Sequence, residues 1–225
     1  MPCFLAGASQ GRILAETLGV PFYAFSHQQG HIAAVCWAAK KLELLDQPML
    51  AWHLSGGTTE LLYVEPDGVN VRAQCVGGTS DISAGQLIDR TGVLLGLPFP
   101  AGKALHALAS KSGPVRGFPV KLNGLTFSLS GMENKGKALA EQGRPPAEIA
   151  RFTLDTVCSV VLRATQEAQR RCPGLPVLCS GGVASNRLLR TVMSDAAFAG
   201  PQYSTDNAMG AAILAWRSLR QEAEA

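Results

Sequence analysis

The chain has 225 residues, of which 47% are hydrophobic and 16% are charged, and its formal net charge is +3 at pH 7. This length suits one large domain or two small lobes, and this composition supports a packed core and argues against intrinsic disorder. No apolar run approaches the ~18 residues of a membrane span, so we expect no membrane association, and the small positive charge favours no particular partner.

The periodicity of apolar residues, with the positions of glycine and proline, predicts the elements of the first half of the chain. In chain order we expect a helix over 4–18, a short strand over 21–25, a helix over 28–45, a buried strand over 48–54, and a hairpin of strands over 59–65 and 69–76. Gly19 follows the first helix as a C-cap, and Asp67 with Gly68 forms the hairpin turn.

The second half is richer in helices. We expect helices over 82–95 and 103–110, one strand or two short strands over 120–129, a long helix over 146–171, a strand over 176–179, a helix over 183–194 and a C-terminal helix over 207–224. Strands, then helices, then a strand–loop–helix unit indicate an α/β fold.

A histidine pair is the sharpest local signal. His27 and His31 stand at i and i+4 in the sequence HQQGH, so on a helix their rings project from one face and can share a metal ion. The alternative is two unrelated histidines at a helix start, one of them capping the helix. Asp206 is a candidate third ligand, or else a simple N-cap of the last helix. The local sequence does not separate these interpretations.

Two similar loops each follow an apolar strand. Residues 55–59 read SGGTT and residues 180–183 read SGGV. Paired glycines let the backbone approach a bound group, and the second loop opens a predicted helix whose N–H groups favour an anion. A tight turn is the alternative for each loop, whereas two such loops in one chain favour a phosphate site.

Two further residues carry alternative interpretations. Asp89 lies one helical turn beyond Gly85 and could accept hydrogen bonds from a ribose, or could be a surface carboxylate paired with Arg90 or another neighbour. Cys179 precedes the second loop and could be a nucleophile, but a buried cysteine at a strand end is commoner. The six cysteines are scattered without a CxxC pair, which indicates free thiols in a reducing compartment, and we expect a cytoplasmic protein.

Six motifs, taken together, resemble one family. In order they are HQQGH, LSGGTTELL, DISAGQLIDRTGVLLGLPFPAG, FSLSG, CSGGVASN and STDNA. This order is similar to that of the tRNA threonylcarbamoyladenosine transferases, the TsaD-type proteins formerly labelled O-sialoglycoprotein endopeptidases. The resemblance covers essentially the whole chain. It implies the two-lobed actin/sugar-kinase/heat-shock ATPase fold, with a ribonuclease-H-like sheet in each lobe and the first lobe incomplete.

The resemblance also implies a division of the chain. Residues 1–75 would be the remainder of the first lobe, 76–205 the second lobe with a helical insertion, and 206–225 a helix returning to the first lobe. The family's usual first segment, with its opening strand and an acidic nucleotide loop, has no counterpart here, which predicts an open sheet edge. Apolar surface left there could drive homo-oligomerisation.

Site residues follow from the same resemblance. The family holds one iron or zinc ion through both histidines of HxxGH and the aspartate of a DNA motif, which implies His27, His31 and Asp206. The substrate cradle would comprise His53, Leu54, Ser55, Gly56, Gly57, Asp89, Gly102 and Asn186. His53 falls where archaeal members place a tyrosine ligand, so we hypothesise it as a fourth ligand.

The implied reaction moves a threonylcarbamoyl group from its adenylate to the adenosine beside the anticodon of tRNA. Family members work with a paralogous dimer partner and an ATPase subunit. A second interpretation is a non-catalytic scaffold paralogue, but the family's smaller partner proteins lack HxxGH, whereas this chain retains it. A metalloprotease is less favoured, because an HExxH enzyme needs a general-base glutamate and this motif offers only Gln28 and Gln29.

Overall fold

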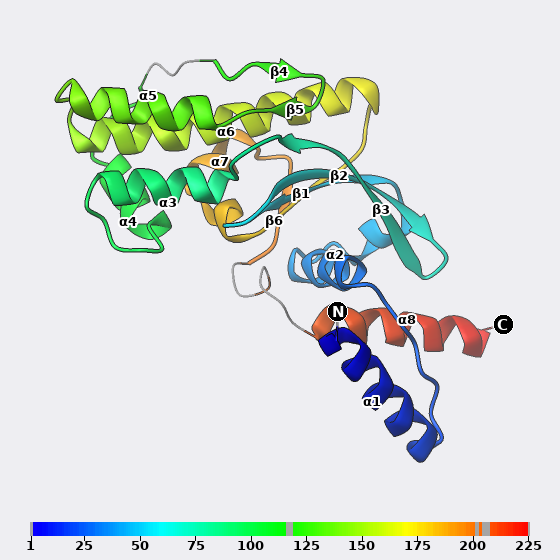
Figure 1. The fold of residues 1–225 in the computed structure, drawn as a ribbon. Coiled ribbons are helices and arrows are strands. Elements are labelled where there is room, and N and C mark those ends of the chain that lie inside the picture. Colours follow the sequence, from blue (N-terminus) through cyan, green and yellow to red (C-terminus); the bar gives the residue numbers. More distant parts are fainter. Residues whose placement is uncertain (1, 116–118, 201–202, 204–207, 225) are drawn as a thin grey trace.

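A mixed sheet forms the centre of the molecule (Figure 1). The computed structural model describes residues 2–115, 119–200, 203 and 208–224, and within these residues seven strands lie in the order β4-β5-β3-β2-β1-β6-β7. Helices cover both faces of the sheet, so the α/β prediction is confirmed.

The elements in chain order are α1 (Pro2–Leu18), α2 (His27–Ala38), the 3-10 helix η1 (Leu42–Asp46), β1 (Met49–Leu54), β2 (Thr59–Asp67), β3 (Asn70–Thr79), α3 (Ala84–Leu94), α4 (Gly102–Ala109), β4 (Leu122–Asn123), β5 (Thr126–Phe127), α5 (Ser130–Glu141), α6 (Pro146–Arg171), β6 (Val177–Ser180), the 3-10 helix η2 (Gly182–Ser185), α7 (Arg187–Val192), β7 (Ala197–Phe198) and α8 (Met209–Glu224). None of the described helices is both long and apolar enough to cross a membrane.

Strand β1 lies between an antiparallel neighbour, β2, and a parallel one, β6. Its side chains alternate between the faces of the sheet. Leu50, Trp52 and Leu54 enter the core beneath α6, while Met49 and Ala51 enter the core beneath α2. Both faces are covered, which explains why this strand is apolar almost throughout. The alternation places position 53 on the α2 side.

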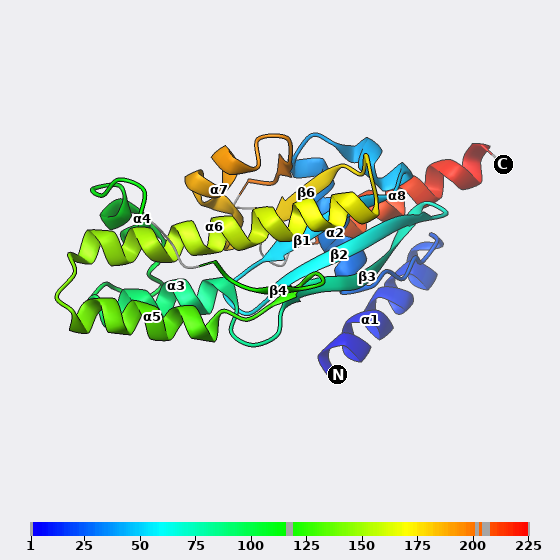
Figure 2. The ribbon, with the colours of Figure 1, turned by 90° about the horizontal axis from the view of Figure 1, so that it is seen from above.

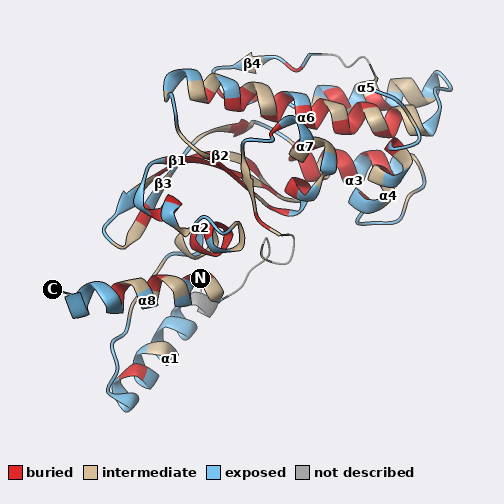
Figure 3. Cartoon of the chain, turned by 180° about the vertical axis from the view of Figure 1, so that it is seen from behind, coloured by how far each residue is buried: buried red, intermediate tan, exposed pale blue. Residues whose placement is uncertain are grey.

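The two cores differ in size. On one face, the 26-residue helix α6 packs with α3, α4, α5 and α7, as the view from above shows (Figure 2). Trp52 is fully buried there, and its indole N–H donates to Thr165 Oγ1 of α6 at 2.8 Å, so its polar atom is satisfied. On the other face, α2 lies between the sheet and α8, and α1 projects away with most of its surface exposed (Figure 3).

Helices α2 and α8 cross at two glycines. A Cβ atom on Gly210 would lie 1.7 Å from the carbonyl oxygen of Gly30, so the two backbones are in direct contact. Since Gly30 stands within the turn from His27 to His31, this crossing fixes the first turn of α2 against the start of α8.

Most predicted elements are confirmed, and three predictions are wrong. Residues 21–25 form no strand; Tyr23 there donates to Glu222 of α8 instead of joining a sheet edge. The helix expected over 28–45 ends at Ala38, because Lys40 takes a left-handed φ of 57° and Lys41 N–H donates to Cys36 O in a Schellman arrangement.

The helix expected over 183–194 is divided into η2 and α7 at Asn186, which has an extended backbone and caps α7 by accepting from Leu188 N. The expected boundary after residue 75 falls inside β3, and β1 pairs with both β2 and β6. The sheet does not divide at that boundary, and the division into lobes stays a prediction.

Candidate functional site

The start of α2 is set by its own sequence. Ser26 Oγ accepts a hydrogen bond from Gln29 N, and the Gln29 side chain accepts one from Ser26 N, which makes a capping box. Ser26 is therefore the cap, and the alternative in which a histidine caps this helix is wrong. His27 becomes the first helical residue, and His31 follows one turn later on the same face.

His27 and His31 are brought together. Their Nε2 atoms lie 3.0 Å apart, and their rings meet edge to face with centroids 4.4 Å apart. Two ligand nitrogens on one tetrahedral zinc are separated by about 3.3 Å, given Zn–N distances near 2.0–2.1 Å. The separation fits that arrangement, and it equally fits a hydrogen bond between one protonated and one unprotonated Nε2. Imidazole nitrogen is a ligand suited to both iron and zinc.

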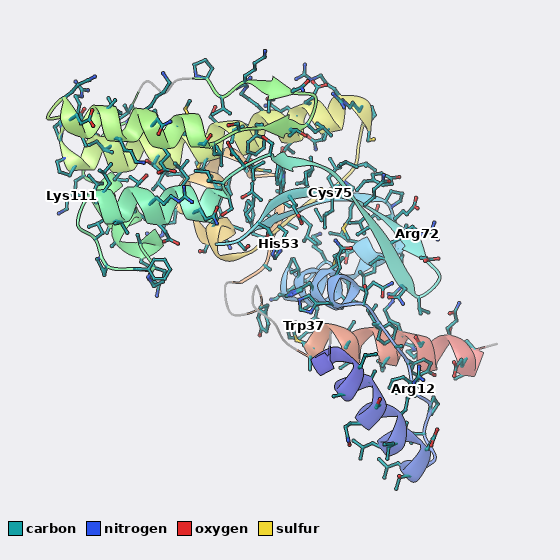
Figure 4. All side chains as sticks on the ribbon, in the orientation of Figure 1. Arg12, Trp37, His53, Arg72, Cys75 and Lys111 are labelled. Carbon is teal, nitrogen blue, oxygen red and sulfur yellow. The ribbon has the colours of Figure 1, made fainter. Side chains whose placement is uncertain are left out.

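His53 completes a cluster of three imidazoles. It lies at the end of β1 on the side facing α2 (Figure 4), with its ring centroid 6.0 Å from that of His31. Ser180 of β6 donates its hydroxyl proton to Trp52 O at 3.0 Å, so its oxygen accepts from His53 Nδ1 at 3.3 Å. In the neutral ring this leaves the lone pair on Nε2.

These side chains line a cavity of about 400 Å³ between α2 and the ends of β1, β2 and β6. Its polar lining comes from His27, Gln28, His31, His53, Ser55, Thr58, Glu60 and Ser180. Glu60 stands directly opposite His53 in the β1–β2 register, on the same face of the sheet. Ile32, Val35 and Leu62 supply apolar walls. The cavity therefore combines a pair of imidazoles with a carboxylate and hydroxyl groups, in a volume that suits a small organic group.

The two glycine loops lie side by side. Because β1 and β6 are parallel neighbours with His53 opposite Ser180, the loops that follow them leave the same edge of the sheet. Gly181 has a φ of 93°, and a Cβ atom there would lie 2.1 Å from Leu54 O, so only glycine fits. Leu54 itself is fully buried.

The first loop is held from two directions. Ser55 Oγ accepts from the N–H groups of Gly57 and Thr58, so this loop closes as a tight turn, and its role toward a phosphate stays a prediction. The start of α3 presses against the loop, because a Cβ atom on Gly85 would lie 2.5 Å from Gly56 Cα, and Ser83 Oγ donates to Gly56 O at 2.7 Å.

Asp89 and Gly102 lie beside each other, away from the cavity lining. Asp89 Oδ1 accepts from Ala101 N at 2.8 Å and so joins α3 to the residue before Gly102. Of the alternatives for Asp89, pairing with Arg90 is wrong, since Arg90 contacts Glu133 at 2.8 Å. Asn186 is also apart from the cavity lining, and besides capping α7 its amide lies 3.9 Å from Cys158 Sγ.

Asp206 lies outside the described residues. Within the described part of the chain, no group of three or more His, Cys, Asp or Glu side chains is placed to hold a metal ion. Of the expected ligands, the described residues therefore supply only the pair of imidazoles in α2.

Cys179 is fully buried at the end of β6, as expected for a structural residue. Burial raises the pKa of its thiol to about 12, against a weaker lowering by the Arg190 guanidinium. The thiolate that a nucleophile requires is therefore scarce near neutral pH.

Residues that sequence reasoning missed also shape the site. Ser180 orients His53, and Glu60 enters the cavity from β2. The sequence predicted both strands but joined 59–65 to 69–76 in its hairpin, so the pairing of β1 with β2, which sets Glu60 opposite His53, was not predicted.

Comparison with known proteins identifies the family. The family model described as TsaD, tRNA N6-adenosine threonylcarbamoyltransferase, matches residues 1–213. The chain belongs to this family. The enzyme of that name from Thermus thermophilus is 36% identical over 224 residues, covering 95% of this chain and 66% of the relative. The one from Streptococcus thermophilus is 31% identical, covering 85% of this chain and 57% of the relative. The chain thus spans about 57–66% of these curated relatives.

Solved structures confirm the fold. Full-length HypF, in its phosphate- and nucleotide-bound form, matches with a TM-score of 0.66 at 14% identity, covering 90% of this chain and 44% of HypF. Component A of the Acidaminococcus fermentans (R)-2-hydroxyglutaryl-CoA dehydratase matches with a TM-score of 0.52 at 15% identity, covering 84% of this chain and 69% of that protein. The expected actin-like ATPase fold is therefore confirmed.

Proposed function

We propose that this protein transfers a threonylcarbamoyl group from its adenylate to N6 of the adenosine beside the anticodon of tRNA, with one iron or zinc ion as cofactor. The tRNA substrate belongs to the family, and membership in the family is shown. The observation that carries the proposal is the Nε2 pair of His27 and His31, 3.0 Å apart at a cavity that adjoins the glycine loops.

The metal ligands in this proposal are His27, His31 and Asp206. The donor set of two imidazoles and one carboxylate is typical of an open catalytic site for zinc or iron. Gly210, four residues after Asp206 in the chain, packs against Gly30 between the two histidines, which supports a ligand from this part of the sequence. His53 is the proposed fourth ligand, because it lies at the end of β1 on the side facing α2, with its ring centroid 6.0 Å from that of His31.

The remaining residues bind and orient the substrate in this proposal. The backbone of Ser55–Gly57 and Gly181 faces the nucleotide, and Asp89 with Gly102 holds its ribose. During transfer, the N6 nitrogen of adenosine bonds to the carbamoyl carbon and gives up one proton to solvent, the bond from that carbon to the phosphate oxygen breaks, and AMP leaves with the electron pair of that bond. When bound, the metal ion would act as a Lewis acid on the threonylcarbamoyl group. Since tRNA is the acceptor, we place the reaction in the cytoplasm. We also expect a paralogous dimer partner and an ATPase subunit to take part.

The test is the metal content of protein purified without chelator or nickel affinity resin. We expect about one iron or zinc per chain, lost in the His27→Ala/His31→Ala variant and retained in His106→Ala, a control histidine on α4. Metal retained by the double variant would contradict the proposal. A His53→Ala variant that keeps full metal affinity would contradict the fourth ligand alone, and absence of metal from the unaltered chain would favour the scaffold interpretation.

A further inference from the structure

Glu60 supplies the only carboxylate among the described residues that line the cavity, and none of those residues is a lysine or an arginine. It is the second residue of β2 and stands opposite His53 of β1 in the strand register. Its neighbour Thr59 faces the other side of the sheet, where Thr59 Oγ1 accepts from Ala84 N at 2.8 Å. Because side chains alternate along a strand, the Glu60 side chain lies on the α2 side, at the cavity.

The sheet gives Glu60 no charged partner. On the side away from β1 it pairs with Gly78 of β3, which has no side chain. A Cβ atom on Gly78 would lie 2.2 Å from Thr59 O and 3.0 Å from Glu60 Cα, so a residue with a side chain does not fit there. Within the described part of the chain the Glu60 carboxylate makes no hydrogen bond and no ion pair. Its oxygens are therefore available to a bound molecule.

The hydroxyl groups of the cavity are used differently. Ser55 Oγ lies 2.9 Å from Thr58 Oγ1 and accepts from two backbone N–H groups of its own loop. Ser180 forms hydrogen bonds with two groups of β1. These three hydroxyls hold the glycine loops and the strands in place. An ionised carboxylate only accepts hydrogen bonds, with room for about four, so a ligand beside Glu60 must bring an O–H or N–H group.

The surface next to this carboxylate is apolar. Leu62, two residues further along β2, lines the same cavity, and Ile32 and Val35 of α2 line it from the other side. A ligand group that fits this place combines a hydrogen-bond donor with a short apolar branch. The side chain of threonine has this composition, because its hydroxyl and its methyl group are carried by the same carbon atom.

We propose that Glu60 selects the threonine side chain of the transferred group by accepting a hydrogen bond from its hydroxyl, while the methyl group contacts Leu62. The inference rests on the proposed function. The threonine carboxylate carries the same charge as Glu60, so repulsion favours a pose with that end toward His27 and His31. A site that bonds a substrate hydroxyl rejects the analogue without it more strongly than an apolar pocket rejects a misfit. A metal-ligand role is less favoured, because Glu60 belongs to no group of three metal-binding side chains among the described residues.

The probes are stable analogues of threonylcarbamoyl adenylate and valylcarbamoyl adenylate, in which a sulfonyl group replaces the phosphoryl group. Each is titrated by calorimetry into the full chain with its metal and without tRNA. Valine carries a methyl group where threonine has its hydroxyl, so the pair isolates the hydroxyl. We expect the unaltered chain to bind the threonyl analogue about ten-fold more tightly or better, since hydrogen bonds to charged groups are the stronger ones.

Three variants separate recognition from damage to the fold. Glu60→Ala should bind the two analogues about equally, through weaker binding of the threonyl analogue alone, and Glu60→Gln, which keeps an acceptor oxygen, should retain part of the preference. The matched control is Glu65→Ala on the same strand, since Glu65 contacts Arg72 at 3.9 Å and lies outside the cavity lining. It should keep the full preference. Metal content should be the same in all of these proteins.

The possible outcomes distinguish this inference from the proposed function. Equal binding of both analogues by the unaltered chain, a preference that survives Glu60→Ala, or loss of metal from that variant would overturn the role of Glu60 and leave the proposed function standing. Equal weakening of both analogues in Glu60→Ala would also overturn it, because a structural role predicts that result. If neither analogue binds the unaltered chain, the proposed function fails and this inference fails with it. A chain that selects the threonyl analogue through Glu60 but does not modify tRNA would contradict the proposed reaction alone.

Discussion

Replacement of Gly210 by alanine tests whether the contact between α2 and α8 holds the histidine pair in place. The added Cβ atom would lie 1.7 Å from Gly30 O and 2.5 Å from Gly30 C, and both atoms belong to the backbone. Neither can turn aside as a flexible side chain could, so the two helices must separate by roughly 2 Å to reach an ordinary contact distance.

Overpacking of this kind typically costs ~1–3 kcal/mol. For a chain of this length each kcal/mol lowers the melting temperature by ~2–4 °C, so Gly210→Ala should melt about 2–12 °C below the unaltered protein. The control is Gly7→Ala in α1, where nothing lies within 4 Å of the added Cβ atom. That substitution should raise stability by ~0.5–1 kcal/mol, because alanine is the better helix former.

Thermal unfolding followed by circular dichroism measures both variants, and metal analysis of the same preparations measures the site. Because Gly30 stands between His27 and His31, separation of the helices should lower metal content in Gly210→Ala and leave it unchanged in Gly7→Ala. If Gly210→Ala melts at or above the temperature of the unaltered protein, the close crossing and the argument drawn from it are refuted.

Three further predictions concern the loops, a cap and the thiols. Gly85→Ala should destabilise by ~1–3 kcal/mol and weaken adenine-nucleotide binding in calorimetry, since its Cβ atom would lie 2.5 Å from Gly56 Cα; unchanged binding would separate this loop from the nucleotide site. Burial alone would raise the pKa of Asp81, but the hydrogen bonds that its carboxylate accepts at the start of α5 lower it. Asp81→Asn should therefore lower the free energy of unfolding in urea by ~0.5–1 kcal/mol. This difference should be present above pH ~4 and should be lost as the pH falls below that value. A constant difference down to low pH would contradict this origin. Iodoacetamide should modify exposed Cys75 in the native protein and leave Cys179 unmodified until unfolding, because burial raises the pKa of Cys179 to about 12; mass spectrometry that finds native Cys179 alkylated would refute its burial.

The errors in the predicted elements share a physical cause. The helix of α2 stops where Lys40 adopts the left-handed conformation, a position usually marked by glycine, so no residue type signalled it. Helix α5 was not predicted, because its cap is Asp81, 48 residues before Leu129 in the chain, rather than a neighbouring residue. Both helix ends depend on interactions that local propensity does not contain.

The site residues, too, were predictable from the sequence only where their placement depends on local spacing. The i, i+4 spacing of His27 and His31 is local, so the sequence alone predicted that the rings would meet. The place of His53 was not predictable in this way, because strand β1 is apolar on both faces and its pattern does not say which face meets α2. Only the covering helices distinguish the two.

The two glycine loops show why long-range pairing decides what this molecule can bind. Each loop alone has the features of a tight turn, and the first is one, since Ser55 ties its own loop together. They become a joint site because β1 and β6, more than 120 residues apart in the chain, are parallel neighbours with His53 beside Ser180. One hydroxyl thus connects the second loop to the imidazole that faces the histidine pair, so a substitution that shifts the register of β6 would alter the loops and His53 together.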